Sequence, residues 1–305
     1  MKDRLLVGSR GSALALAQTS QVISAVKKVA SNLKFEVVSI RTKGDQVHDS
    51  GTAGVEGKSI YTQEIEEALS AGKIDIAVHS MKDLTTNLPQ ELTIAAVPER
   101  INPRDVLISR NKVKFSDLPG RARLGTSSPR RKSQLLAARG DFEVIDIHGN
   151  VSTRLNKLQT GEFDAIVLAA AGLIRLGLEG NATEYLSTKV MLPAIGQGAL
   201  AIEVREDDVE IRELLSKVDH EPTRRAVNAE RAFAQRLGAD CHTPIAAYAK
   251  VDSGRLIIDG LVATRNGSIL MRSRVSSENA SAEKIGQELA EILLSKGAIA
   301  VLEAG

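Results

Sequence analysis

Three segments of this chain occur twice in the same order, and each has the pattern of a β-strand leading into a loop or following a helix. The pairs are residues 4–12 with 123–128, 35–40 with 142–147, and 72–78 with 161–167. Such alternation of strand and helix patterns is typical of α/β proteins with largely parallel sheets. The spacing within a pair shrinks along the chain, which excludes a short-period solenoid. We predict two related α/β lobes; the alternative is that any two α/β domains share such patterns.

Two segments containing proline, residues 97–104 and 192–198, predict chain crossings between the lobes and a cleft at a hinge. After about residue 218 a helical pattern leads into three strand-like runs and a closing helix, with a turn at Asn266-Gly267. We therefore expect a smaller α+β domain with a three-stranded antiparallel sheet. The predicted divisions are lobe 1 at 1–98 and 199–217, lobe 2 at 104–192, and the α+β domain at 218–305.

Composition excludes several classes of protein. The 305 residues carry a net charge of +2, no Trp and 3% aromatic residues, which disfavours nucleic-acid binding. The sequence contains no run of 18 apolar residues, so no membrane span is predicted. One cysteine excludes an internal disulfide, and the five histidines lack metal-site spacing. We expect a cytoplasmic protein without a metal, a nucleic-acid partner or a membrane anchor.

Cationic and hydroxyl side chains gather where the predicted strands end. The two matching first segments supply Ser9, Arg10 and Ser12 in one lobe and Thr126, Ser127, Ser128, Arg130 and Arg131 in the other. Further cations in loops or early helix turns are Lys43, Lys58, Lys82, Arg154 and Arg175. Helix N-termini and guanidinium groups bind carboxylates and phosphates. This pattern predicts a ligand with several anionic groups, although each charge taken singly is typical of a solvated surface.

Two further residues are candidates for chemistry. Asp83 follows a strand-like run and lies among cations, so it is either a structural ion-pair partner or a catalytic acid, base or cation stabiliser. Cys241 is the only thiol, and a lone cysteine is usually a small buried apolar residue. Its Gly- and Pro-bounded loop makes exposure plausible, so both interpretations of Cys241 stay open.

Eight motifs, in order, resemble those of the porphobilinogen deaminase (hydroxymethylbilane synthase) family over essentially the whole chain. They are residues 8–16 (GSRGSALAL), 42–45 (TKGD), 75–83 (DIAVHSMKD), 125–131 (GTSSPRR), 149–154 (GNVSTR), 171–178 (AGLIRLGL), 193–198 (PAIGQG) and 241–245 (CHTPI). The resemblance implies two lobes like those of periplasmic binding proteins, with mixed, mostly parallel sheets, plus the smaller third domain.

The resemblance also implies a transferase of tetrapyrrole biosynthesis, the route to haem, sirohaem and cobalamin-type products. Such an enzyme joins four porphobilinogen molecules head to tail, loses ammonia at each step, and releases hydroxymethylbilane by hydrolysis. Its primer is a dipyrromethane cofactor held by a thioether to a cysteine, and Cys241 occupies that position. The expected partners are porphobilinogen and the growing polypyrrole, with a monomeric enzyme and possible hand-over of product to the next enzyme.

Site roles carry over residue by residue. Asp83 matches the catalytic carboxylate, which would stabilise the electron-poor pyrrole left by loss of ammonia through its N–H. The predicted cofactor- and substrate-binding residues are Arg10, Ser12, Lys58, Lys82, Thr126, Ser127, Ser128, Arg130, Arg131, His148, Arg154, Arg175 and Gln197.

The chain departs from the family pattern at four places. His148 stands where the family usually has Arg, and a neutral imidazole cannot replace a guanidinium fork, which makes that contact weaker or pH-dependent. The other departures are residues 56–61, Thr85 and Asp240. We expect an active enzyme with an altered grip on its cofactor.

Three alternatives remain. A two-lobed solute-binding protein would bind reversibly without a covalent adduct. A polyanion-binding protein of the nucleic-acid type would show a steep salt dependence that is flattened by mutation of Arg130 and Arg131. A degenerate family member would carry the cofactor and leave porphobilinogen unchanged.

Overall fold

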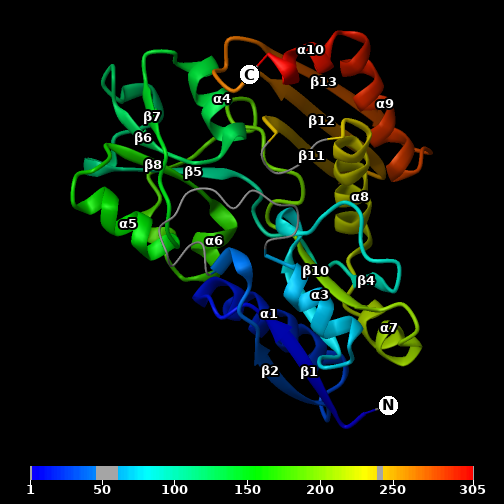
Figure 1. Ribbon diagram of the computed structural model, residues 1–305. Helices are drawn as coiled ribbons and strands as arrows, with labels where there is room; N and C mark the ends of the chain where they lie inside the picture. Colours follow the sequence, from blue (N-terminus) through cyan, green and yellow to red (C-terminus); the bar gives the residue numbers. More distant parts are fainter. Residues whose placement is uncertain (1, 46–60, 239–242, 305) are drawn as a thin grey trace. The chain divides into compact units, whose positions relative to one another are not determined.

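The computed structural model describes residues 2–45, 61–238 and 243–304 (Figure 1). The chain divides into two compact units, residues 1–101 with 199–224 and residues 102–198 with 225–305. The helices are α1 (Ala13–Val29), α3 (Gln63–Ser70), α4 (Pro129–Ala138), α5 (Val151–Gln159), α6 (Ala170–Arg175), α7 (Val209–Ser216), α8 (Glu221–Arg236), α9 (Ala282–Ser295) and α10 (Ala298–Glu303). The short 3₁₀ helices are η1 (Met81–Asp83), η2 (Arg110–Lys112), η3 (Phe115–Asp117) and η4 (Glu179–Asn181).

Two five-stranded sheets have the same strand directions and an equivalent strand order, although the antiparallel fourth strand comes last in the chain in one and first in the other. The first contains β1 (Arg4–Ser9), β2 (Lys34–Ser39), β3 (Ile76–Ser80), β4 (Leu92–Ala96) and β10 (Leu200–Arg205), in the order β2-β1-β3-β10-β4. The second contains β5 (Asp105–Ser109), β6 (Arg123–Gly125), β7 (Glu143–Ile145), β8 (Ala165–Ala169) and β9 (Glu184–Tyr185), in the order β7-β6-β8-β5-β9. β10 and β5 are antiparallel to both neighbours, whereas the first three strands of each sheet are parallel.

The sequence repeat maps onto these sheets. The three matched segments contain β1 and β6, β2 and β7, and β3 and β8, which occupy equivalent positions. The prediction of two similar, mostly parallel α/β lobes is therefore confirmed. The boundaries of the three predicted domains remain a prediction.

Successive side chains along a strand point to opposite faces of the sheet, and apolar side chains lie on both faces of each five-stranded sheet. In the first unit Leu5 and Val7 lie in a core with α1 and α7, while Leu6 packs in a second core with Ile65 and Leu69 of α3. The second unit repeats this arrangement, with Leu135 of α4 in one core and Leu158 of α5 in the other. Each sheet is covered on both faces, as parallel sheets require.

In each five-stranded sheet an aspartate side chain accepts a hydrogen bond from a backbone N–H at the same position of the neighbouring parallel strand. Asp75 Oδ2 accepts the backbone N–H of Leu6 at 2.8 Å, and Asp164 Oδ2 accepts that of Arg123 at 2.8 Å. An arginine at the end of the antiparallel strand pairs with each: Arg205 at 3.7 Å and Arg110 at 2.8 Å. These contacts show that Asp75 and Asp164 occupy corresponding places in the two units.

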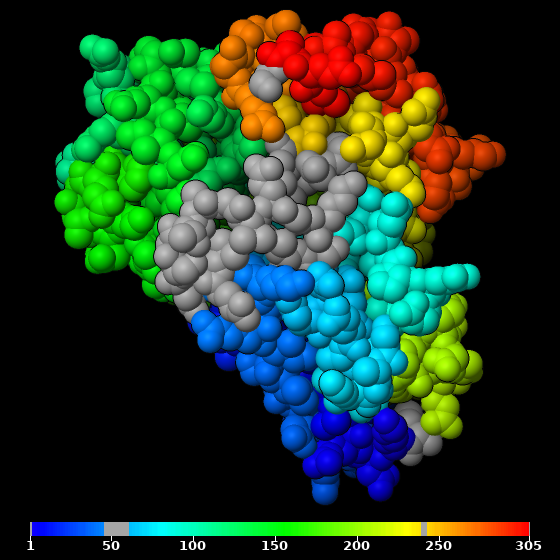
Figure 2. Space-filling model, viewed as in Figure 1, coloured from blue at the N-terminus to red at the C-terminus, as the bar shows by residue number. Residues whose placement is uncertain are grey.

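The third sheet is antiparallel, with the order β11-β12-β13, as predicted. Its strands are β11 (Ile245–Asp252), β12 (Arg255–Ala263) and β13 (Leu270–Ser277). Ser253 and Gly254 both have positive φ, which suits a two-residue hairpin turn. α9 and α8 bury Leu289 and Phe233 against this sheet, while α9 and α10 form surface (red in Figure 2). The short helix α10 was not predicted.

Close packing of α9 against α8 requires Gly286. A Cβ there would overlap the carbonyl oxygen of Ala229 and lie 2.9 Å from the Cβ of Ala232. We expect Gly286→Ala to lower the free energy of unfolding by about 1–3 kcal/mol through overpacking, measured by urea denaturation. Gly180→Ala is the control, because a Cβ there meets nothing within 4 Å. Equal stability of both variants would contradict this account of the packing.

Candidate active site

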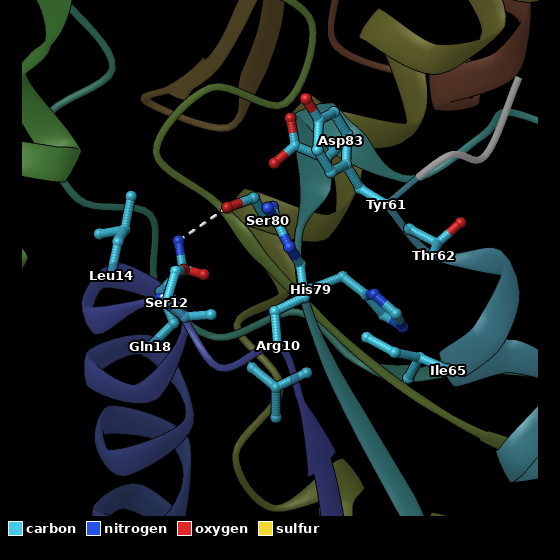
Figure 3. Close-up of a pocket in the computed structure, with 12 residues that line it drawn as sticks. Arg10, Ser12, Leu14, Gln18, Tyr61, Thr62, Ile65, His79, Ser80 and Asp83 are labelled. Carbon is cyan, nitrogen blue, oxygen red and sulfur yellow. Dashed lines mark hydrogen bonds between the residues drawn. The ribbon is translucent and has the colours of Figure 1, made fainter. Parts of the chain in front are cut away.

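In the first unit, a pocket forms where β1 and β3 end (Figure 3). Parallel strands present their carboxyl ends at one edge of a sheet, which brings Arg10 and Ser12, after β1, near Ser80 and Asp83, after β3. The pocket measures about 380 Å³, including open space at its mouth. Its lining residues are Arg10, Ser12, Leu14, Ala15, Gln18, Tyr61, Thr62, Ile65, Val78, His79, Ser80 and Asp83.

Asp83 ends the short helix η1 at the edge of this pocket. The backbone N–H of Met81 donates to the carbonyl of Ala199 at 3.1 Å, which ties η1 to the residue before β10. Asp83 is exposed, and no hydrogen bond or ion pair to its carboxylate occurs within the described part of the chain. Such a carboxylate is available to a ligand's N–H or cation. Lys82, also predicted, is exposed beside it.

The Arg10 side chain is held in place by contacts with Asp45 and Tyr61. Its guanidinium donates to Asp45 Oδ1 from Nε at 3.1 Å and from Nη2 at 2.5 Å, and it lies 4.4 Å from the centre of the Tyr61 ring. Burial raises the pKa of Asp45, but hydrogen bonds from Arg10 and Thr42 outweigh it, so the net pKa is lowered. Asp45 therefore keeps its negative charge and holds Arg10 at the pocket, where a ligand carboxylate would compete for the guanidinium.

Hydroxyl groups shape the strand ends in both units. Ser12 caps α1 by accepting the N–H of Ala15 at 3.2 Å. In the second unit Ser127 Oγ donates to the carbonyl of Ile147 at 2.8 Å and accepts its N–H at 3.0 Å. Thr126 Oγ1 accepts the N–H of Ser128 at 3.2 Å. These bonds fix the loop between β6 and α4, whereas Ser128 makes no side-chain cap to that helix.

Arg130 and Arg131, predicted as carboxylate-binding residues, are 4% and 7% exposed and converge on Asp105. Arg130 Nη1 lies 2.8 Å from Asp105 Oδ2, and Arg131 Nη2 lies 2.8 Å from Asp105 Oδ1. Arg130 also donates to the carbonyl of Leu192 at 2.8 Å, and Gln197 Nε2 donates to Asp105 at 3.2 Å. The cluster contains two guanidinium groups and one carboxylate, so it keeps an excess positive charge.

The two guanidinium groups also affect the ionisation of Asp105. Burial favours the neutral form of Asp105, but Arg130 and Arg131 outweigh it and lower its pKa to about 2. Burial also lowers the pKa of Arg131. One carboxylate therefore stays ionised and organises two buried cations.

The remaining predicted residues of the second unit lie on α5, α6 and the loop before α5. Arg154 Nε donates to the carbonyl of Gly149 at 2.7 Å, and Arg175 Nη2 donates to that of Gly198 at 3.0 Å. Burial lowers the pKa of Arg175 to about 10. His148 is exposed. The predicted Lys58 and Cys241 lie outside the described residues.

Comparison with known proteins identifies the family. The family model described as "Porphobilinogen deaminase, dipyromethane cofactor binding domain" matches residues 5–213, and that described as "Porphobilinogen deaminase, C-terminal domain" matches residues 224–295. The chain belongs to the porphobilinogen deaminase family. The predicted family, a transferase with a dipyrromethane cofactor, is thereby confirmed.

Similar curated proteins cover nearly the whole chain. Porphobilinogen deaminase of Carboxydothermus hydrogenoformans is 46% identical over 303 residues, covering 99% of this chain and 97% of that protein. The enzyme of Geobacillus kaustophilus is 48% identical over 300 residues, covering 98% and 96%. Among solved structures, the methionine binding protein MetQ is 13% identical, with a TM-score of 0.45 over 71% of this chain and 89% of that chain.

The porphobilinogen deaminase motifs did not point to every residue of the site. Gln18 Nε2 donates to Ser80 Oγ at 2.7 Å, and Tyr61 also lines the pocket; Gln18 and Tyr61 both lie outside the eight motifs. His79, which lines the pocket too, lies within the motif at 75–83. Within residues 2–45, 61–238 and 243–304, no group of three His, Cys, Asp or Glu could hold a metal, and no helix is long and apolar enough to cross a bilayer.

The Asp105 cluster generates a prediction about stability. We expect Asp105→Asn to lower the free energy of unfolding by about 3–5 kcal/mol, because two buried guanidinium groups lose their counter-charge. The depressed pKa of Asp105 stabilises the fold above its ordinary value of 3.8, and this stability is lost as pH falls towards 2. The melting temperature of the unmodified protein should therefore fall in this range more steeply than that of the variant.

Asp141→Asn is the matched control, because Asp141 forms a 2.7 Å ion pair with Arg139 on the surface. It should change stability far less. Similar losses in the two variants would contradict the role of Asp105.

Proposed function

We propose that this chain catalyses the deaminating, head-to-tail condensation of four porphobilinogen molecules and hydrolytic release of hydroxymethylbilane. Family membership supports the reaction. The observation that carries it is the exposed Asp83 carboxylate, which pairs with no side chain of residues 2–45, 61–238 or 243–304, in a pocket with Arg10, Ser12 and Ser80. Porphobilinogen offers an N–H donor and two carboxylates, and this pocket offers an acceptor, a cation and hydroxyl groups. The match of donors and acceptors favours this substrate.

We propose Cys241 as the attachment point of the dipyrromethane primer through a thioether. It is the one cysteine in the sequence, so no other thiol competes for that role. When bound, the primer supplies the terminal pyrrole carbon that accepts each new unit. Four carboxylates on such a primer need cationic partners, and the excess positive charge of the Arg130–Arg131–Asp105 cluster fits this requirement.

Asp83 is the proposed catalytic residue. Its carboxylate would accept a hydrogen bond from the pyrrole N–H of the substrate and stabilise the positive charge that develops as ammonia leaves. It could also move protons during deamination and coupling. No side chain in the described part of the chain pairs with the carboxylate, so none of those residues neutralises its charge.

The proposed carboxylate-binding residues fall into two sets. Arg10, Ser12, Lys58 and Lys82 belong to the first unit, and Thr126, Ser127, Ser128, Arg130, Arg131, His148, Arg154, Arg175 and Gln197 to the second. Partial burial strengthens the interaction of a carboxylate with Arg175, since the group is already partly desolvated. Gln197 and Asp105 position Arg130 and Arg131 for the same task.

We further propose that the protein is a cytoplasmic monomer that hands its product to the next enzyme. A single cysteine suits a reducing compartment. The three-domain division, with lobes at 1–98 plus 199–217 and 104–192 and a third domain at 218–305, is part of the same proposal.

Covalent attachment can be read by intact mass. We expect the purified protein to carry the added mass of two condensed pyrrole units and Cys241→Ser to carry none. If the purified protein lacks the added mass, it should be incubated with porphobilinogen and its mass measured again, because apoprotein can be isolated. An unchanged mass after that incubation would favour a reversible solute-binding protein instead.

The role of Asp83 can be separated from folding. We expect Asp83→Asn to keep its fold and any attached primer but to lower kcat by about 100-fold or more, the usual effect of removing a charge-stabilising group. Asp117→Asn is the control, since Asp117 also ends an exposed 3₁₀ helix. Consumption of porphobilinogen at the unmodified rate in Asp83→Asn would refute the catalytic assignment.

A further inference from the structure

Three titratable side chains are buried together beneath the pocket of the first unit. His79 Nε2 lies 3.0 Å from Glu203 Oε2, and these side chains are 3% and 0% exposed. Glu66 of α3 is also buried. One oxygen of each glutamate, Oε1, has no hydrogen-bond partner among the described residues. Unpartnered buried oxygens of this kind are costly, so the group needs a reason to exist.

Strand alternation explains why they meet. Ala77 of β3 lies in the core beneath α3, so His79, two residues later, lies on the same face. β10 runs antiparallel with Glu203 opposite Ala77, which places Glu203 on this face too. Figure 3 shows the His79 ring turned toward Ile65 of α3 and away from Asp83.

The second unit shows that the fold does not require these charges. Ile166 of β8 pairs with Gly125, and Ala77 of β3 pairs with Gly8, so Ile166 corresponds to Ala77. Asp164 corresponds to Asp75 in the same way. With this correspondence the positions of Glu66, His79 and Glu203 are taken by Leu155, Leu168 and Ile108. All three belong to or pack against one apolar core. An apolar triad therefore satisfies the same architecture.

Replacing buried ionisable groups by apolar side chains of similar size is often neutral or stabilising. The charged set in the first unit is thus not explained by stability. It adjoins the pocket: His79 lines it and precedes Ser80, and Glu66 follows Thr62 in the first turn of α3. We propose that Glu66, His79 and Glu203 form a proton-sharing triad that positions the end of β3, with Asp83, and the start of α3 for catalysis.

The triad acts through geometry, and it rests on the proposed function. A hydrogen bond between imidazole and carboxylate is directional, so it fixes the His79 ring and with it the strand end that leads to Asp83. Glu66 extends the same set to α3, whose preceding residues Tyr61 and Thr62 line the pocket. Apolar side chains would fill the space without this directional restraint.

The protonation state follows from the surroundings. Burial raises the pKa of Glu66, and the nearby charge of Glu203 raises it further, whereas a hydrogen bond with Thr62 and the charge of His79 lower it; the net pKa is raised. Glu67, on the same helix, adds a small like-charge effect. Of the cations on the strands packed against α3, Arg4 pairs with Glu36 and Arg205 donates to the carbonyl of Leu69 at the far end of the helix. The surroundings therefore shift Glu66 towards its protonated form.

The second unit suggests the decisive variant, Glu66→Leu/His79→Leu/Glu203→Ile. We expect it to melt at the same temperature as the unmodified protein or higher, but to show kcat reduced by about 10- to 100-fold, as small misplacements of catalytic groups do. Turnover is normalised to the fraction carrying the primer mass. A folded variant that carries no primer also supports the proposal, because building the primer uses the same condensation. Unreduced kcat in the folded variant overturns it.

A second experiment does not depend on the triple variant folding. A raised glutamate pKa makes stability fall as pH rises from its usual value of about 4.3 to the raised value. Glu66→Gln keeps the protonated shape, so it should flatten this fall in melting temperature and move the alkaline limb of kcat to higher pH. Glu67→Gln, one residue along and exposed, is the control and should do far less.

These readouts separate the two proposals. If the unmodified protein consumes no porphobilinogen, the proposed function fails, while the melting curves of Glu66→Gln still test the raised pKa of Glu66. If porphobilinogen is consumed and Glu66→Gln matches Glu67→Gln in both pH profiles, the triad fails and the function stands.

Discussion

The antiparallel pairing of β10 with β3 is the constraint on which the first unit's site depends. The pairing extends from Ala77 to Ser80 along β3. It brings together His79 and Glu203, which are 124 residues apart in the sequence. The backbone bond from Met81 to Ala199 then continues the pairing into the turn that carries Asp83. The position of the Asp83 carboxylate is therefore set by backbone hydrogen bonds from a strand that arrives late in the chain.

Buried charge is distributed differently in the two units. The second unit concentrates guanidinium groups around one carboxylate, Asp105, and keeps an excess positive charge suited to a polyanionic ligand. The first unit buries acidic groups around one imidazole, and its exposed acid, Asp83, lies above them. Buried ion pairs contribute little net stability, so their survival in both units is better explained by function than by folding.

Much of the fold could be predicted because it follows local patterns. The repeated strand segments identified β1, β2 and β3 with their counterparts, and the Asn-Gly turn identified the β12–β13 hairpin. The partners of the site residues could not be predicted in this way. Arg130 and Arg131 were expected in a cationic loop, yet they are buried because Asp105 enters the sheet as part of an antiparallel strand from 25 residues earlier. Glu66 gave no signal, since an acidic residue on a helix is usually exposed.

The duplication separates what the architecture needs from what each unit does. Corresponding aspartates, Asp75 and Asp164, remain in both units because each supports a backbone N–H that the sheet would otherwise leave unpaired. The charged clusters have no counterpart: α1 begins with Ala13-Leu14-Ala15 where α4 carries its two arginines, and the triad positions are apolar in the second unit. A residue retained in both halves is explained by folding, whereas a buried charge present in only one half requires a ligand or a reaction. Under the roles proposed above, the second unit is specialised for holding anions and the first for moving protons.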